Sequence, residues 1–200
     1  MMSLKNAVIS VVASVSLIGC AINVSPSAFF YQDTQQKPLD TTKLHAAIQK
    51  DKTSAGITRV EVKNEAGLTL RGVAVSYPDP IVNIVFFADN RMPVSENNSV
   101  IHRLGKLPAN ILWLDYQGVG ASDKAKDLSI NAIKQDALTQ FDYVASAFDV
   151  SIPTIVHGRG IGSYFASYVA ANRKIDALVL DGAFNNISDL IANMVPGFSN

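Results

Sequence analysis

The stretch that decides the fold is TIVHGRGIGSYFA, residues 154–166. It begins as an apolar run of strand length and ends with a composition that suits a helix. Between the two, Gly158, Gly160 and Gly162 stand at alternate positions. Glycines between a strand and a helix permit positive φ and a close approach of backbones. The stretch therefore predicts a strand, a tight turn and a helix.

Three further apolar runs have the composition of strands buried on both faces, namely residues 81–87, 110–115 and 176–181. Residues 129–149 carry apolar side chains at steps of three and four after Ser129. This spacing predicts a helix with Ser129 as its N-cap. Strands alternating with helices predict an α/β fold, with a mostly parallel sheet and helices on both faces.

Residues 57–76 alternate apolar and polar side chains on both sides of the sequence NEAG. The pattern predicts an antiparallel β-hairpin that opens the sheet on its N-terminal side. In sheets of this kind ligands bind beyond the carboxyl ends of the strands. The most informative residues are therefore those just after Phe87, Leu114, His157 and Leu180.

The composition describes one globular domain with a substantial core, since 48% of the 200 residues are hydrophobic and 17% are charged. The 17 basic and 17 acidic residues give a net charge of zero and are well mixed along the chain. Nucleic acid is therefore excluded as an expected partner, because it requires a basic surface. We also expect no metal site and no cofactor.

Residues 1–19 read as a secretory signal peptide, because one positive charge precedes an uncharged apolar run too short to span a bilayer. The run ends in LIGC, which resembles a bacterial lipobox and implies a lipid such as palmitate on Cys20. Cys20 is the single cysteine, so no internal disulfide competes for it. The alternative is a buried cysteine behind a plain signal peptide.

The residue after the cysteine is Ala21, and by resemblance to Gram-negative lipoproteins this implies the outer membrane. The membrane would then be a partner through Cys20. Residues 20–56 are rich in Ser, Gln, Thr and Lys, and we expect a lipidated tether and lead-in there. Residues 57–200 are expected to form the folded domain.

Four motifs, in the same order along the chain, resemble the α/β-hydrolase superfamily and in particular its serine esterase/peptidase-like branch. The first is DYQGVGAS (115–122), which matches the DYRGYGxS loop of that branch, and the second is Asp136-Ala137, which matches an Asp-Ala pair. The third is PTIVHGRGIG (153–162), which matches the strand and the G-x-S-x-G turn. The fourth is KIDALVLDGAFNNISDL (174–190), which matches the next strand and helix. The resemblance runs from about Phe29 to Leu190. It implies hydrolysis of esters or amides through an acyl-serine.

The sequence departs from this family where the chemistry takes place. Gly160 stands at the position of the nucleophilic serine, so no side chain is available there. The oxyanion loop reads FFADNRM, in which Ala88 and Asp89 replace His-Gly and only Asn90 matches. Asp89 would place a negative charge beside a developing oxyanion, which is the wrong sign for catalysis. We therefore expect an envelope lipoprotein whose hydrolase-like domain is catalytically silent.

The other members of a triad are not found either. The resemblance implies an acid after the seventh strand and a histidine after the last, and the sequence ends soon after the sixth. His45, His102 and His157 all lie elsewhere. Asp181 remains as an acid candidate, and capping of the following helix is the other explanation for it. Three other polar residues are assigned to packing and loop hydrogen bonds: Asp115, Ser122 and Ser163.

Two alternatives stay open. One is an active serine hydrolase of which this sequence is a truncated or altered part. The other is a dinucleotide-binding domain, in which Gly158 and Gly160 approach a pyrophosphate and Asp181 binds a ribose hydroxyl. Against the second alternative, Ser163 replaces the third glycine and the turn follows the third buried strand.

Two structural expectations complete the prediction. Gly160 relieves the strain that a nucleophile suffers at positive φ, while Gly158 and Gly162 keep the strand and helix in close contact. Strand 176–181 is apolar on both faces and no later strand is available in the sequence to cover it. We therefore expect an open edge there, at which a protein partner can add a strand.

Overall fold

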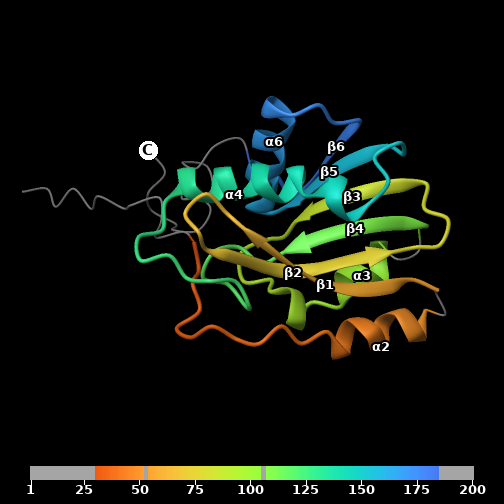
Figure 1. Cartoon of the computed structure of the whole chain (residues 1–200), viewed down its shortest axis with the longest axis horizontal. Coiled ribbons are helices and arrows are strands. Elements are labelled where there is room, and N and C mark those ends of the chain that lie inside the picture. The colour runs from red at the N-terminus through yellow and green to blue at the C-terminus, as the bar shows by residue number, and fades with distance from the viewer. Residues whose placement is uncertain (1–29, 52–53, 105–106, 185–200) are drawn as a thin grey trace, which may run out of the picture.

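The computed structural model describes residues 30–51, 54–104 and 107–184. Six strands form one sheet in the order β1-β2-β4-β3-β5-β6 (Figure 1). β2 is antiparallel to both of its neighbours, and β4, β3, β5 and β6 run parallel to one another. The strands are β1 (Gly56–Lys63), β2 (Thr69–Ser76), β3 (Val82–Phe87), β4 (Ala109–Leu114), β5 (Thr154–Arg159) and β6 (Ala177–Asp181).

Helices cover both faces of this sheet (Figure 1). α4 (Ile130–Asp142) and α6 (Gly162–Asn172) lie on one face, and α2 (Thr42–Lys50) and α3 (Ser99–Leu104) lie on the other. A 3-10 turn, η2 (Val94–Glu96), precedes α3. The predicted α/β fold, with its N-terminal hairpin and mostly parallel sheet, is confirmed.

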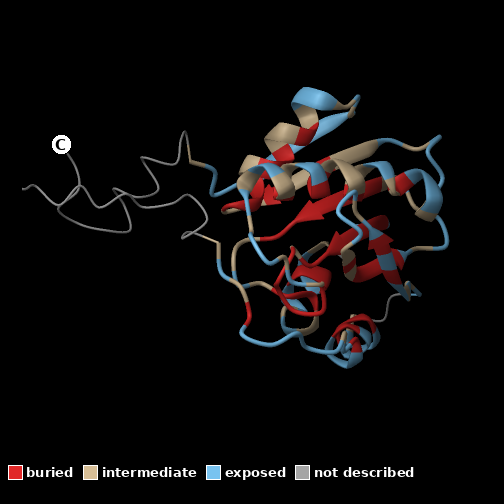
Figure 2. Cartoon of the chain, turned by 60° about the vertical axis from the view of Figure 1, so that its left-hand side comes forward, coloured by how far each residue is buried: buried red, intermediate tan, exposed pale blue. Residues whose placement is uncertain are grey.

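The core divides between the two faces because successive side chains of a strand point in opposite directions. Val85, Leu112 and Val156 pack against the face of α4 and α6. Ile84 and Trp113 pack against the face of α2 and α3. The central strands are buried along their length and appear red in Figure 2. Such strands read as continuous apolar runs, which is why the sequence revealed them.

The helix expected over residues 129–149 is capped as predicted, since the Ser129 hydroxyl accepts a hydrogen bond from the Ala132 amide at 3.1 Å. It is divided in two, however. α4 ends at Asp142, and a short helix α5 (Val144–Ala147) follows. Tyr143 between them keeps helical angles (φ −68°, ψ −17°), so the apolar spacing continues and buries Val144.

The lead-in segment differs from the expectation of a simple tether. α2 lies within it, and Leu44, Ala47 and Ile48 are buried against the sheet. Asp33 is also buried, and its carboxylate accepts the Gly120 amide at 2.8 Å. The folded domain therefore begins before residue 57. The apolar stripe of α2 was hidden because polar residues dominate the composition around it.

The expected signal peptide and Cys20 lie outside the described residues, as do residues 185–200. Among the described helices, none has the length and apolar character needed to cross a membrane. β6 is the last strand of the sheet in the described part of the chain and pairs there with β5. All five of its residues are exposed.

Candidate functional site

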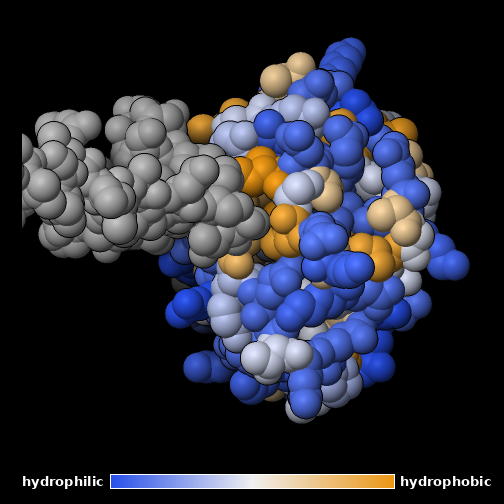
Figure 3. Space-filling view, turned by 90° about the vertical axis from the view of Figure 1, so that its left-hand side faces the viewer, coloured by the Kyte–Doolittle hydropathy of each residue, from blue (hydrophilic) through white to orange (hydrophobic). Residues whose placement is uncertain are grey.

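The parallel strands create a crevice where β3 and β5 end side by side. After β3 the chain crosses to α3 on one face, and after β5 it crosses to α6 on the other (Figure 1). Ligands bind in such crevices at the carboxyl ends of α/β sheets. On the surface at this end, hydrophobic side chains form a patch among hydrophilic ones (Figure 3). Two residues of the candidate site, Asp89 and Gly160, meet in this crevice.

The turn after β5 has the backbone of a nucleophile elbow. Gly160 has φ of +54°, in the left-handed region. Its amide donates to the Asp181 carbonyl at 2.8 Å, and its carbonyl accepts the Ser163 amide at 3.0 Å. A Cβ on Gly158 would overlap the backbone of α6, and one on Gly162 would overlap the carbonyl of Phe87. Gly160 is thus needed for its positive φ, whereas Gly158 and Gly162 are needed because neighbouring backbone lies too close for a side chain.

The carboxylate of Asp89 occupies the space of the missing serine side chain. A Cβ built on Gly160 would overlap all three carboxylate atoms of Asp89. The Asp89 Oδ1 atom accepts the amide of Asn90 at 2.8 Å and the amide of Ile161 at 3.2 Å. Two backbone N–H groups on one oxygen, one of them from the residue after the elbow, form an oxyanion-hole geometry. A carboxylate of the chain itself therefore fills the hole.

Neighbouring groups hold the Asp89 loop in place. The Tyr116 hydroxyl donates to the Ala88 carbonyl at 2.8 Å. Burial raises the pKa of Tyr116 well above its usual range, and the charge of Asp89 acts in the same direction, so the hydroxyl stays protonated as a donor. The Asn90 side chain accepts the Tyr31 amide at 3.0 Å. The loop is thus fixed from two sides.

None of the three histidines makes a hydrogen bond at the turn within the described residues. His45 is exposed on α2. His102 is exposed on α3 and pairs with Asp51 at 2.8 Å. His157 lies within β5, two strand positions before Arg159. Within the described residues, none of the three histidines is therefore placed to act as the general base for a serine at residue 160.

Asp181 and Ser163 have other partners. The Asp181 carboxylate faces Arg159, with 3.6 Å between Oδ2 and Nε. The helix that Asp181 was expected to cap lies outside the described residues. Ser163 is buried, and its hydroxyl donates to the Gly158 carbonyl at 3.0 Å. This bond ties the first turn of α6 to β5, which is a packing role.

Asp115 and Ser122 belong to a network that shapes the loop after β4. The Asp115 carboxylate accepts the amides of Val94 at 2.7 Å and Ala121 at 3.0 Å. The Ser122 hydroxyl donates to the Asp115 carbonyl at 2.7 Å and accepts the Arg71 amide at 2.8 Å. Burial raises the pKa of Asp115 to about 7, against the effect of its two amide donors.

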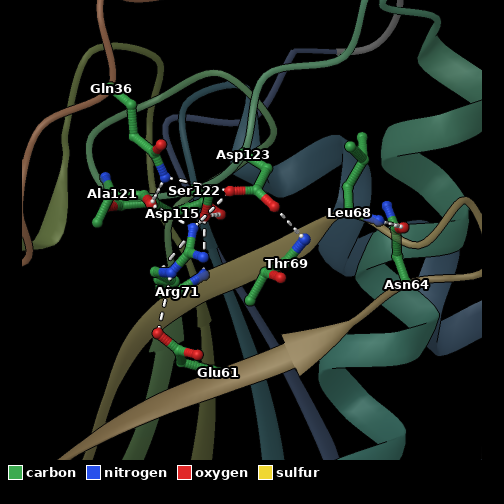
Figure 4. A network of polar contacts seen from close by, with 10 residues as sticks. All are labelled: Gln36, Glu61, Asn64, Leu68, Thr69, Arg71, Asp115, Ala121, Ser122 and Asp123. Carbon is green, nitrogen blue, oxygen red and sulfur yellow. Dashed lines mark hydrogen bonds and ion pairs between the residues drawn. The ribbon is translucent and has the colours of Figure 1, made fainter.

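The Arg71 side chain extends this network across the sheet surface (Figure 4). Its guanidinium contacts Glu61 at 3.0 Å and Asp123 at 2.6 Å, and Asp123 also accepts the Thr69 amide at 2.8 Å. These bonds fasten the loop after β4 to the hairpin. Sequence reasoning missed the network, because its members are about fifty positions apart.

Asp136 also has a structural role, because it holds neighbouring side chains by hydrogen bonds. It is buried on α4 and accepts hydrogen bonds from the side chains of Asn64 and Gln117. Burial raises the pKa of Asp136. The resemblance placed Asp136 in this helix, but no sequence signal indicated its contacts with Asn64 and Gln117. Across the described residues, no three His, Cys, Asp or Glu side chains gather in a way that would hold a metal ion.

No family model and no curated protein matches the sequence. Solved structures do match. The Pyrococcus furiosus esterase Pf2001 aligns over 84% of this chain and 63% of its own, with a TM-score of 0.65 and 16% identity. The α/β hydrolase GrgF from Penicillium sp. sh18 aligns over 62% of this chain and 45% of its own, with a TM-score of 0.52 and 22% identity. This chain has the α/β-hydrolase fold.

The chain spans less than two thirds of the length of these hydrolases, with 58% and 63% for two structures of the Pyrococcus esterase. An α/β hydrolase from Novosphingobium aromaticivorans gives 44%, at a TM-score of 0.50 and 19% identity over 64% of this chain. At such identities the likeness concerns the fold alone. What this crevice can do chemically depends on its own residues, Gly160 and Asp89.

The hydrolase fold and the crevice both argue against the dinucleotide alternative. A pyrophosphate at this turn would need the N–H groups at the start of α6. The Ile161 amide already donates to Asp89. A phosphate brought to the same place would meet a carboxylate of its own sign. Asp181 is also directed at Arg159 rather than left to bind a ribose.

Proposed function

We propose that this chain is an α/β-hydrolase-fold protein of the cell envelope that does not hydrolyse esters or amides through a serine. The observation that carries the proposal is the Asp89 carboxylate, which stands against Gly160 and accepts the Ile161 amide. Acyl transfer on this fold needs a nucleophile on the elbow and an empty oxyanion hole above it. Here the residue on the elbow, Gly160, has no side chain, and the Asp89 carboxylate fills the oxyanion hole.

The charge of Asp89 strengthens the argument. A tetrahedral intermediate places a negative oxygen where the Asp89 oxygen lies, so the substrate carbonyl would have to displace an anion that already has two amide donors. If the protein continues beyond residue 200, further residues can supply an acid or a histidine. They would leave the elbow itself unchanged, because Gly160 and Asp89 both lie within the described part.

The envelope location rests on the N-terminal sequence. A short apolar run after one positive charge, ending in LIGC, supports export and attachment of a lipid to Cys20. Anchoring by a lipid would place the hydrolase-fold domain at a membrane surface, with the outer membrane as the proposed site. The function of such a domain would be binding rather than turnover.

The test is an assay of the mature chain against nitrophenyl acetate and butyrate, together with a fluorophosphonate probe for an activated serine. We expect hydrolysis no faster than in buffer and no labelling by the probe. Hydrolysis that survives in Asp89→Asn would reveal a nucleophile elsewhere. Hydrolysis that disappears in Asp89→Asn would show that Asp89 takes part in the reaction as nucleophile or general base. Either result would overturn the proposal.

A further inference from the structure

A small cavity lies beside the turn, on the face of the sheet that carries α2 and α3. It lies between α3 and the strands β5 and β6, and its volume is about 200 Å³. Ligand pockets usually measure about 300 to 1,000 Å³, so an occupant here must be small. Phe86, Val100 and Leu104 supply the apolar part of the lining.

His157 contributes a buried polar atom without a partner. The Nε2 atom of its ring is buried and has no hydrogen-bond partner among the described residues. The ring stacks edge-on against Phe86, with 5.2 Å between the centroids. Burial lowers the pKa of His157, so the imidazole is neutral at neutral pH. A buried polar atom left unpaired costs free energy, and a polar group of a ligand would remove that cost.

Two guanidinium groups stand at the same cavity. Arg103, in the last turn of α3, forms no hydrogen bond or ion pair with the other described residues. Arg159 forms an ion pair with Asp181 through its Nε atom at 3.6 Å, and the other guanidinium nitrogens of Arg159 remain available to a ligand. The cavity therefore has two positive charges, of Arg103 and Arg159, and one negative charge, of Asp181, around its apolar lining. One negative charge on a ligand would balance the group, whereas a dianion would be repelled by Asp181.

We propose that this cavity binds a small apolar monocarboxylate. A carboxylate is planar and accepts paired hydrogen bonds, which suits the forks of Arg103 and Arg159. The tail of the ligand lies against Phe86 and Leu104. The His157 ring, in the tautomer with its proton on Nε2, donates to the ligand. This site is separate from the Asp89 position, so it stands whether or not the chain hydrolyses esters.

The test is a titration of the full mature chain with benzoate, followed by the NMR signal of the His157 ring and by calorimetry. We expect saturable binding and a shift of the His157 signal. Benzamide, which has the same ring without the charge, should bind about tenfold more weakly, and Arg103→Gln should weaken benzoate binding by about tenfold. Arg59→Gln, an exposed arginine on β1 outside the cavity, is the matched control and should change nothing.

Three results would overturn the proposal. The first is a His157 signal that does not shift at the highest soluble concentration of benzoate, although the protein remains folded. The second is equal affinity for benzoate and benzamide, which would describe an apolar hole without a site for an anion. The third is an unchanged affinity in Arg103→Gln. Because Arg103 is exposed, this variant is expected to keep the fold, and its thermal midpoint checks that.

Discussion

Gly160→Ser is the substitution that most directly tests the position of Asp89. The new side chain would stand at φ +54°, in a region that costs a residue other than glycine about 1 kcal/mol. Its Cβ would also overlap the Asp89 carboxylate, which must then leave the Ile161 amide. Loss of a hydrogen bond to a charged group costs about 1.5 kcal/mol at the lower end of its range, which suits a half-buried site. The total is about 2.5 kcal/mol.

The two contributions can be separated by a double-mutant cycle. Asp89→Ala alone removes both amide hydrogen bonds and should cost about 3 kcal/mol. In that background Gly160→Ser meets no carboxylate and should cost only the strain of about 1 kcal/mol. The coupling energy between the two sites is therefore about 1.5 kcal/mol, measured by urea unfolding of the four proteins.

Gly67→Ser is the matched control for backbone strain. Gly67 has φ of +78° in the turn between β1 and β2, and a Cβ there would meet nothing within 4 Å. It should lose about 1 kcal/mol and nothing more. The reasoning fails if Gly160→Ser costs no more than Gly67→Ser, or if the cycle is additive. Esterase activity or probe labelling of Gly160→Ser in the Asp89→Ala background would show a working base and would contradict the expectation that the chain supplies none.

Three further predictions follow from the buried network, the N-terminus and the sheet edge. The Asp115 pKa of about 7 in the folded state exceeds the ordinary value of 3.8, so the folded state holds the extra proton and stability falls as pH rises. The free energy of unfolding should drop by on the order of 3 kcal/mol between pH 5 and pH 8, and Asp115→Asn should abolish that part of the slope in urea titrations. A palmitate analogue should label the wild type and not Cys20→Ser, and equal labelling would contradict lipidation. The exposed β6 edge should make the isolated chain dimerise or recruit a strand, whereas a monomer in sedimentation with protected β6 amides would count against an open edge.

Local patterns in the sequence predicted most of the fold. Apolar runs and alternation located the strands, and Ser129 marked the start of α4, because these signals depend on neighbouring residues. α2 was missed, since only Leu44, Ala47 and Ile48 distinguish it from a polar tether. Contacts between residues far apart in the sequence could not be predicted. The sequence indicated that the charge of Asp89 has the wrong sign for catalysis, but not that its carboxylate binds an amide 72 positions away.

The same contact explains why Gly160 and Asp89 occur together. A side chain at residue 160 needs the space that the Asp89 carboxylate fills, and the carboxylate needs a residue without a Cβ opposite it. The amide of Ile161, left without an oxyanion to bind, would be an unpaired donor at the start of α6, and Asp89 supplies its acceptor. Gly160 avoids the backbone strain of positive φ, and Asp89 accepts the hydrogen bond of the Ile161 amide. Gly160 and Asp89 therefore fit together chiefly because each leaves room for the other, and a serine placed at residue 160 alone should give neither the elbow geometry nor the activity of a hydrolase.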